Sequence, residues 1–295
     1  MQHSVKIFSR IGELMQGILP DGSPFLVSGL PSRTFFSEAT LEDGPGSSST
    51  LPPRAQQAVD LFYRLHPKHT GGTAPSDRIP AILPRISLRS NIPPGKGLSS
   101  SSADILSILY VLNEHRRTNL SPAQLYSIAA RVEPTDPCLS TDIVVFKQQT
   151  GITDQTLCLP PLAMTWFDAA PDRQVDTLEV QRLYDKDAPG FFRLLLQQFL
   201  LSASAADHQG LFDCITRSAL YNQSIISLPR FGEYYRLAVR EQAGLMVAHS
   251  GTIIGLLTRP EAAAALIPLV ETMANRDQQT TVHIEKYFSP GIVPA

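Results

Sequence analysis

The sequence predicts an α+β fold for this chain of 295 residues. Apolar residues recur at helical spacing in several segments, while shorter segments show the alternation or the continuous apolar run that is typical of strands. The last third of the chain combines both patterns, because predicted strands at 245–248, 252–257 and 281–287 surround a predicted helix at 260–275. Helices and strands are therefore mixed along the chain, as in α+β proteins.

The other helices are predicted from apolar spacing and from their ends. Apolar residues between Ile105 and Leu112 lie at i, i+3, i+4 and i+7 and form one face of a helix. The next helix begins at Ser121, which forms a capping box with Gln124, and it ends before Pro134 because proline disfavours helical geometry in the preceding residue. Further helices are expected at 55–65, 189–206, 208–226 and 230–243.

Three more strands are predicted before the last third. Residues 85–89 alternate between apolar and polar, residues 143–146 form an apolar run, and residues 164–167 form another within a proline-containing stretch. Segments 42–54 and 68–80 are rich in Gly, Pro and Ser and are expected to be loops. We expect two domains, at 1–157 and 158–295.

The composition excludes several classes of protein. Hydrophobic residues make up 43% of the chain and charged residues 18%, which predicts a folded core rather than disorder. The net charge of −2 gives no bulk attraction to nucleic acid or to anionic membranes. The three cysteines lack the spacing of a zinc site. No apolar run is long enough for a signal peptide or a membrane span, so we expect a cytoplasmic protein.

The strongest functional feature is a loop between a predicted strand and a predicted helix. Glycines allow the backbone to approach a ligand closely, and the free amides and dipole of a helix N-terminus favour an anion. Consecutive serines add hydroxyl groups and a lysine adds a positive charge. The loop could bind the phosphates of a nucleotide, although it lacks the Gly-Lys-Ser/Thr of a Walker A motif; a flexible connector is the alternative. Its residues are Pro93, Pro94, Gly95, Lys96, Gly97, Leu98, Ser99, Ser100, Ser101 and Ser102.

This loop resembles the phosphate-binding motif of the GHMP small-molecule kinases, P-x-x-x-G-L-G-S-S-A-A. Three further segments resemble the branch formed by bacterial L-threonine kinases of cobalamin assembly: Gly12–Gly17 (GELMQG), Val132–Asp136 (VEPTD) and Val247–Thr252 (VAHSGT). The resemblance implies an N-terminal domain similar to ribosomal protein S5, a C-terminal ferredoxin-like domain and an active site in the cleft between them.

The resemblance also implies roles for individual residues. The loop from Pro93 to Ser102 would bind ATP, with Ser101 and Glu133 as ligands of Mg²⁺. Asp136 would orient or deprotonate the acceptor hydroxyl, as phosphoryl transfer depends on positioning and on charge neutralisation. The acceptor would lie near residues at both ends of the chain: Gly12, Glu13, Gln16, Ser250 and Gly251.

Two departures leave alternatives open. Ser99 stands where the family motif has a second glycine. Asp142 lies in a segment similar to the one that carries the catalytic aspartate in other GHMP branches, so it competes with Asp136 for that role. Without the resemblance, Glu133 is equally well explained as a solvated residue at a helix end, and Asp136 before Pro137 as a turn residue.

The function implied by the resemblance is ATP-dependent phosphorylation of L-threonine to O-phospho-L-threonine. One alternative is a GHMP kinase for another small hydroxyl compound, such as homoserine, serine or an amino alcohol. A second is a nucleotide-binding protein of the same fold without turnover. The sequence does not indicate an oligomeric state.

Overall fold

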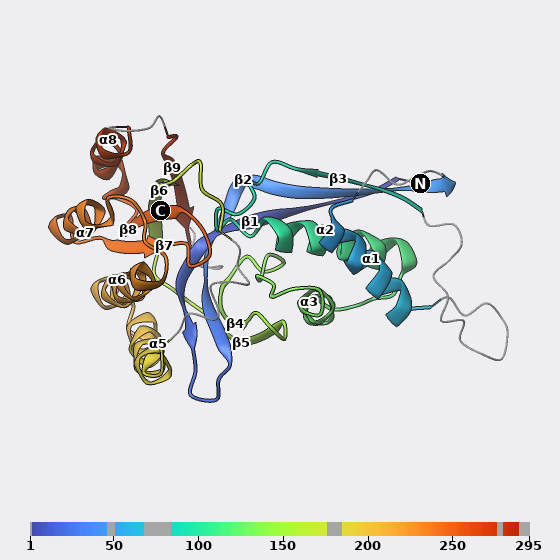
Figure 1. Cartoon of the computed structure of the whole chain (residues 1–295), viewed down its shortest axis with the longest axis horizontal. Helices are drawn as coiled ribbons and strands as arrows, with labels where there is room; N and C mark the ends of the chain where they lie inside the picture. Colours follow the sequence, from blue (N-terminus) through green and yellow to red (C-terminus); the bar gives the residue numbers. More distant parts are fainter. Residues whose placement is uncertain (1, 46–50, 68–83, 176–184, 276–279, 289–295) are drawn as a thin grey trace.

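The computed structural model describes residues 2–45, 51–67, 84–175, 185–275 and 280–288. The described elements form two antiparallel sheets with helices packed against them (Figure 1). The first sheet and its helices come from the N-terminal half of the chain, and the second sheet and its helices come from the C-terminal half.

The first sheet is built on a long hairpin. Its two strands pair with each other antiparallel over most of their length, and the second strand also pairs with two shorter strands at different points along it. The order along the main path is β1-β2-β4-β5, with β3 attached to β2. The strands are β1 (Gln2–Ile18), β2 (Pro24–Pro45), β3 (Pro84–Ser90), β4 (Ile143–Lys147) and β5 (Ile152–Leu157).

Three helices accompany this sheet, and the middle one, α2, packs on both β1 and β2. Helix α3 begins with the predicted capping box, since the Ser121 side chain accepts a hydrogen bond from the backbone of Gln124 and the Gln124 side chain accepts one from the backbone of Ser121. The helices are α1 (Pro53–Leu65), α2 (Ser100–Arg116) and α3 (Pro122–Ala130).

The second sheet has the strand order β7-β8-β6-β9, with every pair antiparallel. This is the order expected of a ferredoxin-like domain, in which each helical connection spans one intervening strand. Helices α5 to α8 gather around this sheet at one end of the molecule (Figure 1). The elements are β6 (Leu162–Asp168), α5 (Ala188–Ser204), α6 (His208–Ile225), α7 (Phe231–Arg240), β7 (Gly244–Val247), β8 (Ile253–Thr258), α8 (Ala263–Ala274) and β9 (His283–Tyr287).

The described residues form two clusters of buried apolar side chains, one of which extends across both halves while the other lies within the C-terminal half. The buried members of the first cluster include Leu14 and Phe25 of the long hairpin, Leu106 of α2 and Phe192 of α5. Strand β1 contacts α2 and also α5, α6 and β7, so the hairpin belongs to the N-terminal sheet and packs on the C-terminal helices as well. Residues near the middle of β1 are thereby placed at the junction of the two halves.

The α+β class is confirmed, and most predicted elements lie within a few residues of their predicted bounds. Strands β1, β2 and β5 were not predicted. The expectation of a loop from residue 42 is wrong up to Pro45, since β2 continues to that residue. The predicted loop at 68–80 lies outside the described residues, and the predicted domain boundary falls between β5 and β6. In the described part of the chain, no helix is long and apolar enough to span a bilayer.

Candidate active site

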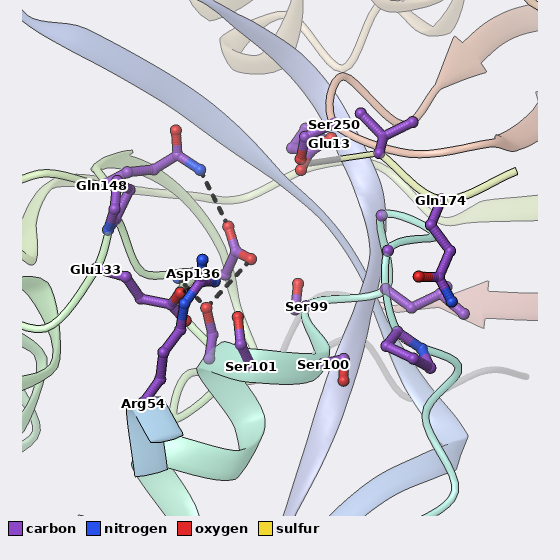
Figure 2. Close-up of a pocket in the computed structure, with 17 residues that line it drawn as sticks. Glu13, Arg54, Ser99, Ser100, Ser101, Glu133, Asp136, Gln148, Gln174 and Ser250 are labelled. Atoms are coloured by element: carbon purple, nitrogen blue, oxygen red, sulfur yellow. Dashed lines mark hydrogen bonds and ion pairs between the residues drawn. The ribbon is translucent and has the colours of Figure 1, made fainter. Parts of the chain in front are cut away.

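A pocket of about 400 Å³ lies where the loop before α2 meets the two halves of the molecule (Figure 2). It brings together residues that are far apart in the sequence. Glu13 and Ser250 lie beside each other on one side, and Glu133, Asp136 and Gln148 lie on another. Other lining residues include Arg54, Pro94, Gly95, Gly97, Leu98, Ser99, Ser100, Ser101, Ser102, Gln174 and Val175.

The first turn of α2 leaves its backbone amides available to a ligand. The Ser99 side chain makes no capping hydrogen bond to the backbone amides of this turn. Ser99 itself adopts a left-handed conformation with φ of 54°, which explains why glycine is common at this position of the family motif. An uncapped helix N-terminus at the wall of a pocket favours the binding of an anion such as phosphate.

The loop carbonyls before α2 face other parts of the protein. The carbonyl of residue 95 accepts a hydrogen bond from the Val175 amide at 3.1 Å, and the carbonyl of residue 96 accepts one from the Thr252 amide at 3.1 Å. The carbonyl of residue 97 accepts one from the Gly12 amide at 2.9 Å. Gly97 has φ of +81°, and a Cβ atom built on it would lie 2.2 Å from Cβ of Ala248. The loop is therefore held tightly at its carbonyl side, and glycine is required for this fit.

The ammonium group of Lys96 does not lie where the sequence analysis expected it. Its Nζ atom is 2.9 Å from Oδ2 of Asp168 and donates hydrogen bonds to three backbone carbonyls of the C-terminal half. Within the loop 93–102, all of which is described, Pro93 and Lys96 do not line the pocket. The expectation that Lys96 supplies a positive charge to the pocket is therefore corrected, because Asp168 and the carbonyls already bind that charge.

Glu133 lies at the base of the pocket, close to Ser101. Its Oε2 atom forms a hydrogen-bonded ion pair with Arg54, and its Oε1 atom is buried without a protein partner. Burial raises the pKa of Glu133, while hydrogen bonding to Ser101 and the charge of Arg54 act in the opposite direction. The arrangement leaves Oε1 of Glu133 unpartnered in the same pocket as the Ser101 hydroxyl, and both groups are the hard oxygen ligands that Mg²⁺ prefers.

Asp136 lies in the segment between α3 and β4. Gln148 donates a hydrogen bond to its Oδ1 atom at 3.2 Å, Ser102 donates one to Oδ2 at 3.4 Å, and the Ser102 hydroxyl accepts one from the Asp136 amide at 2.9 Å. Burial, with a further contribution from the charge of Glu13, raises the pKa of Asp136 to about 6. A carboxylate with such a pKa is mostly ionised at neutral pH yet is a stronger base than an ordinary aspartate.

The competing residue Asp142 does not line the pocket. Its backbone amide donates a hydrogen bond to the Ser140 hydroxyl, and its carbonyl accepts one from the buried guanidinium of Arg10 at 2.7 Å. Arg10 also donates hydrogen bonds to the carbonyls of Pro137 and Ser140, so it holds the segment that follows Asp136. Of the two aspartates, only Asp136 has its carboxylate in the pocket.

Glu13 brings a second carboxylate to the pocket from β1. Its side chain is buried, and its Oε2 atom accepts a hydrogen bond from the His249 amide at 3.0 Å. The His249 ring contacts the same oxygen through Nδ1 at 3.6 Å and the Ser218 hydroxyl through Nε2 at 3.0 Å. The ring of His249 thus supports Glu13 from behind rather than facing the pocket.

The other residues expected near the acceptor are placed differently. Ser250 lines the pocket, whereas Gly12, Gln16 and Gly251 do not. Gly12 and Gly251 contact the loop 93–102 instead, which we name the phosphate loop. Gly12 donates a hydrogen bond to it, and a Cβ atom on Gly251 would lie 2.1 Å from the carbonyl oxygen of Lys96. Gln16 is buried farther along β1.

Five lining residues were not predicted: the polar residues Arg54, Gln148 and Gln174, and the apolar residues Pro134 and Val175. Arg54 lies at the end of the predicted loop 42–54. The one signal for it is its position directly before the predicted helix at 55–65, which would restrict where its side chain can reach. Gln148 follows β4, and Gln174 follows β6. Uncharged polar residues of this kind carry no spacing signal, so the tertiary fold is needed to find them.

The pocket fits a nucleotide phosphate chain together with Mg²⁺. The uncapped helix, the glycine-containing loop and the hydroxyls from Ser99 to Ser102 suit phosphate oxygens, and Oε1 of Glu133 has no protein partner. In the described residues, no group of three or more His, Cys, Asp or Glu could hold a metal ion without help. This agrees with the usual way in which Mg²⁺ binds, through one or two protein oxygens and substrate phosphates.

Comparison with known proteins shows what the chain is similar to. The family of GHMP kinase N-terminal domains matches residues 57–158. The chain is 28% identical over 262 residues to an L-threonine kinase of Salmonella typhimurium, which covers 83% of this chain and 79% of that protein. The fold is similar to that of homoserine kinase from Cytophaga hutchinsonii, at 17% identity and a TM-score of 0.63, covering 95% of this chain and 94% of the other.

A second solved structure of similar fold is mevalonate diphosphate decarboxylase from Enterococcus faecalis, in which the mechanism of ATP binding was described. It has a TM-score of 0.67 at 14% identity, covering 98% of this chain and all of the other. At such identities, the two structures establish the fold alone. Residues 57–158 therefore form a GHMP kinase N-terminal domain, and the chain as a whole has the fold of the GHMP kinases.

Proposed function

We propose that this protein transfers the γ-phosphoryl group of ATP to the hydroxyl of L-threonine, giving O-phospho-L-threonine and ADP. The observation that carries the proposal is the presence of two buried or partly buried carboxylates, Glu13 and Asp136, on the same pocket as the phosphate loop. A small amino acid needs one group for its ammonium and one for its reacting hydroxyl. The similarity to L-threonine kinases supports this choice of acceptor.

The nucleotide end of the pocket is formed by the loop and by α2. Backbone amides at the uncapped helix N-terminus would bind the phosphates, and the hydroxyls from Ser99 to Ser102 would add hydrogen bonds. Ser101 and Glu133 would hold Mg²⁺, which neutralises negative charge on the phosphates when it is bound. These groups supply the positioning and the charge neutralisation on which phosphoryl transfer depends.

Asp136 would act at the acceptor. The hydroxyl oxygen forms a bond to the γ-phosphorus while the bond from that phosphorus to the bridging oxygen of ADP breaks, and Asp136 accepts the hydroxyl proton. Its raised pKa makes it a better base, and its hydrogen bonds from Gln148 and Ser102 fix its direction. Glu13 would bind the ammonium group of the acceptor, and Ser250 lies beside it as a further polar contact.

The second candidate acceptor is homoserine, because homoserine kinases share the fold. Homoserine carries the same ammonium and carboxylate but places its hydroxyl on a longer side chain. The distance from Glu13 to Asp136 would therefore decide which hydroxyl reaches the base.

A coupled assay of ADP release tests the proposal with L-threonine, L-serine, L-homoserine, 1-amino-2-propanol and 3-hydroxybutyrate. The last two compounds lack the carboxylate and the ammonium, respectively. We expect the highest kcat/KM for L-threonine. The kcat/KM for 3-hydroxybutyrate should be lower than that for L-threonine by at least about tenfold, and this difference should be smaller in the Glu13→Gln variant. A preference for homoserine would favour the second candidate, and nucleotide binding without ADP release on any acceptor would indicate a protein without turnover.

A further inference from the structure

Lys96 belongs to the phosphate loop, but its ammonium group contacts the C-terminal half of the protein and does not line the pocket. Besides Asp168, its Nζ atom donates to the carbonyls of Ala170 at 3.0 Å, Pro171 at 2.6 Å and Arg173 at 2.6 Å. The Lys96 side chain is only 9% exposed. An ammonium group has three protons to donate, so these four acceptors use its full capacity.

The acceptors of Lys96 belong to one segment, residues 168–175, which we name the strap. The strap begins at the last residue of β6 and is joined to the phosphate loop a second time, because Val175 donates a hydrogen bond to the carbonyl of Gly95. It is also joined to the turn between β7 and β8, since Ala169 donates one to the carbonyl of Thr252 at 2.9 Å. Thr252 in turn donates to the carbonyl of Lys96, which closes a ring of contacts between loop, strap and turn.

The strap also forms part of the pocket wall. Gln174 and Val175 line the pocket, and Figure 2 shows Gln174 beside the loop. A Cβ atom on Gly95 would lie 3.0 Å from Cβ of Gln174, so loop and strap are packed without spare room. The position of Gln174 is therefore fixed by the same contacts that fix the phosphate loop.

We propose that Lys96 is a positioning residue that locks the phosphate loop to the strap, and that it is not a phosphate ligand. If its ammonium turned towards a bound phosphate, Asp168 would lose its cationic partner and keep only the hydrogen bond from the Ala170 amide. The carbonyls of Pro171 and Arg173 would lose the hydrogen bond from Lys96. Removing the cation from a partly buried carboxylate is unfavourable, as is the loss of hydrogen bonds to carbonyls. These contacts of Lys96 with Asp168 and the strap carbonyls, which we name the lock, set the shape of the loop and place Gln174 at the nucleotide end of the pocket. The inference rests on the proposed binding of ATP.

The two roles of Lys96 predict opposite effects for a change at Asp168, which does not line the pocket. If Lys96 positions the loop, Asp168→Asn loosens the lock and weakens nucleotide binding. If Lys96 is a phosphate ligand, the same change frees its charge, and nucleotide binding stays equal or becomes tighter. Lys96→Met weakens binding under both roles, so Asp168 is the informative site.

Titration calorimetry with the non-hydrolysable nucleotide AMP-PCP and Mg²⁺ can measure this difference. We expect Asp168→Asn and Lys96→Met each to raise Kd by about tenfold or more, the scale of one hydrogen bond to a charged group. The double variant should be no weaker than Lys96→Met alone, since both changes break one contact. The matched controls are Lys147→Met and Asp154→Asn. These two residues form a more exposed ion pair, with 3.4 Å between Nζ and Oδ2, and neither lines the pocket. Both control variants should leave Kd unchanged. Unchanged or tighter binding in Asp168→Asn would overturn the proposal.

Hydrogen exchange tests the lock without nucleotide. In Lys96→Met, the amides of Ala169, Val175 and Thr252 should exchange faster, while amides of the β1–β2 pairing keep their protection. Unchanged exchange at these three amides would contradict the lock, and faster exchange everywhere would show a global loss of stability instead. If the wild-type protein binds no nucleotide, the proposed function fails, but the exchange result still decides whether Lys96 holds the strap.

Discussion

Asp136→Asn should reduce activity and increase stability in the same protein. The substitution keeps the size of the side chain but removes the negative charge that accepts the hydroxyl proton. We expect turnover to fall by about 10²-fold or more, the usual scale for a positioned general base. Gln148 can still donate to the remaining Oδ1 atom, so the fold around residue 136 should persist.

The gain in stability follows from the pKa of Asp136. Folding raises it from an ordinary value of 3.8 to about 6, so the folded state keeps its proton at a pH where the unfolded state has lost it. The wild-type protein therefore loses stability as the pH rises from about 4 to about 6, by about 3 kcal/mol at about 1.4 kcal/mol per pH unit. The asparagine variant does not titrate, so its free energy of unfolding is not lowered in this way. It lacks the weak hydrogen bond from Ser102, which contributes about 1 kcal/mol to the stability of the wild type. The net gain is about 2 kcal/mol at pH 8 and disappears near pH 4.

Urea unfolding at pH 8 and at pH 4, together with the coupled assay, measures both effects. Asp142→Asn is the matched control, because its carboxylate lies outside the pocket, and it should change neither activity nor stability. A variant Asp136→Asn that is less stable than wild type at pH 8, or that keeps its turnover, would refute the reasoning. Loss of activity in Asp142→Asn alone would assign the base to that residue.

Four further substitutions test other parts of the pocket. Glu133→Ala and Ser101→Ala should each raise the Mg²⁺ concentration needed for half-maximal activity, because each removes an oxygen ligand; an unchanged Mg²⁺ titration would argue against the metal site. Gly97→Val should abolish measurable AMP-PCP binding while circular dichroism stays native, since its side chain would displace the loop from Ala248, and wild-type affinity would remove the loop from the site. Ser99→Gly should raise stability by up to about 1 kcal/mol in thermal unfolding, because it relieves the left-handed conformation; a lower Tm would show that the Ser99 hydroxyl matters more than the backbone.

Some parts of the fold were accessible from sequence because their signals are local. The capping box of Ser121 and Gln124 defines the start of α3, and the proline at position 134 limits its end. The long strand β1 carries no such signal. Its residues from Ser9 to Gly17 are all buried, since one side faces α2 and the other faces the C-terminal helices, so the alternation that marks a half-exposed strand is absent.

The residues of the site likewise divide into those that a local motif predicts and those that only the tertiary fold brings into place. Ser101, Glu133 and Asp136 lie in recognisable segments and are found together in the pocket. The direction of the Lys96 side chain depends on Asp168 and on the carbonyls of the strap, which come near the loop only through the second sheet. Arg54 reaches Glu133 only because α1 packs beside α2, a contact that no short motif records.

A competition experiment tests the central claim most directly. Equal concentrations of L-threonine, L-serine and L-homoserine share a limiting amount of ATP with Mg²⁺, and mass spectrometry measures the phosphorylated products. Their ratio gives the relative kcat/KM of the three acceptors under identical conditions. We predict that O-phospho-L-threonine dominates and that Asp136→Asn forms almost none of it. A dominant product of L-homoserine, or the absence of any phosphorylated amino acid, would contradict the account.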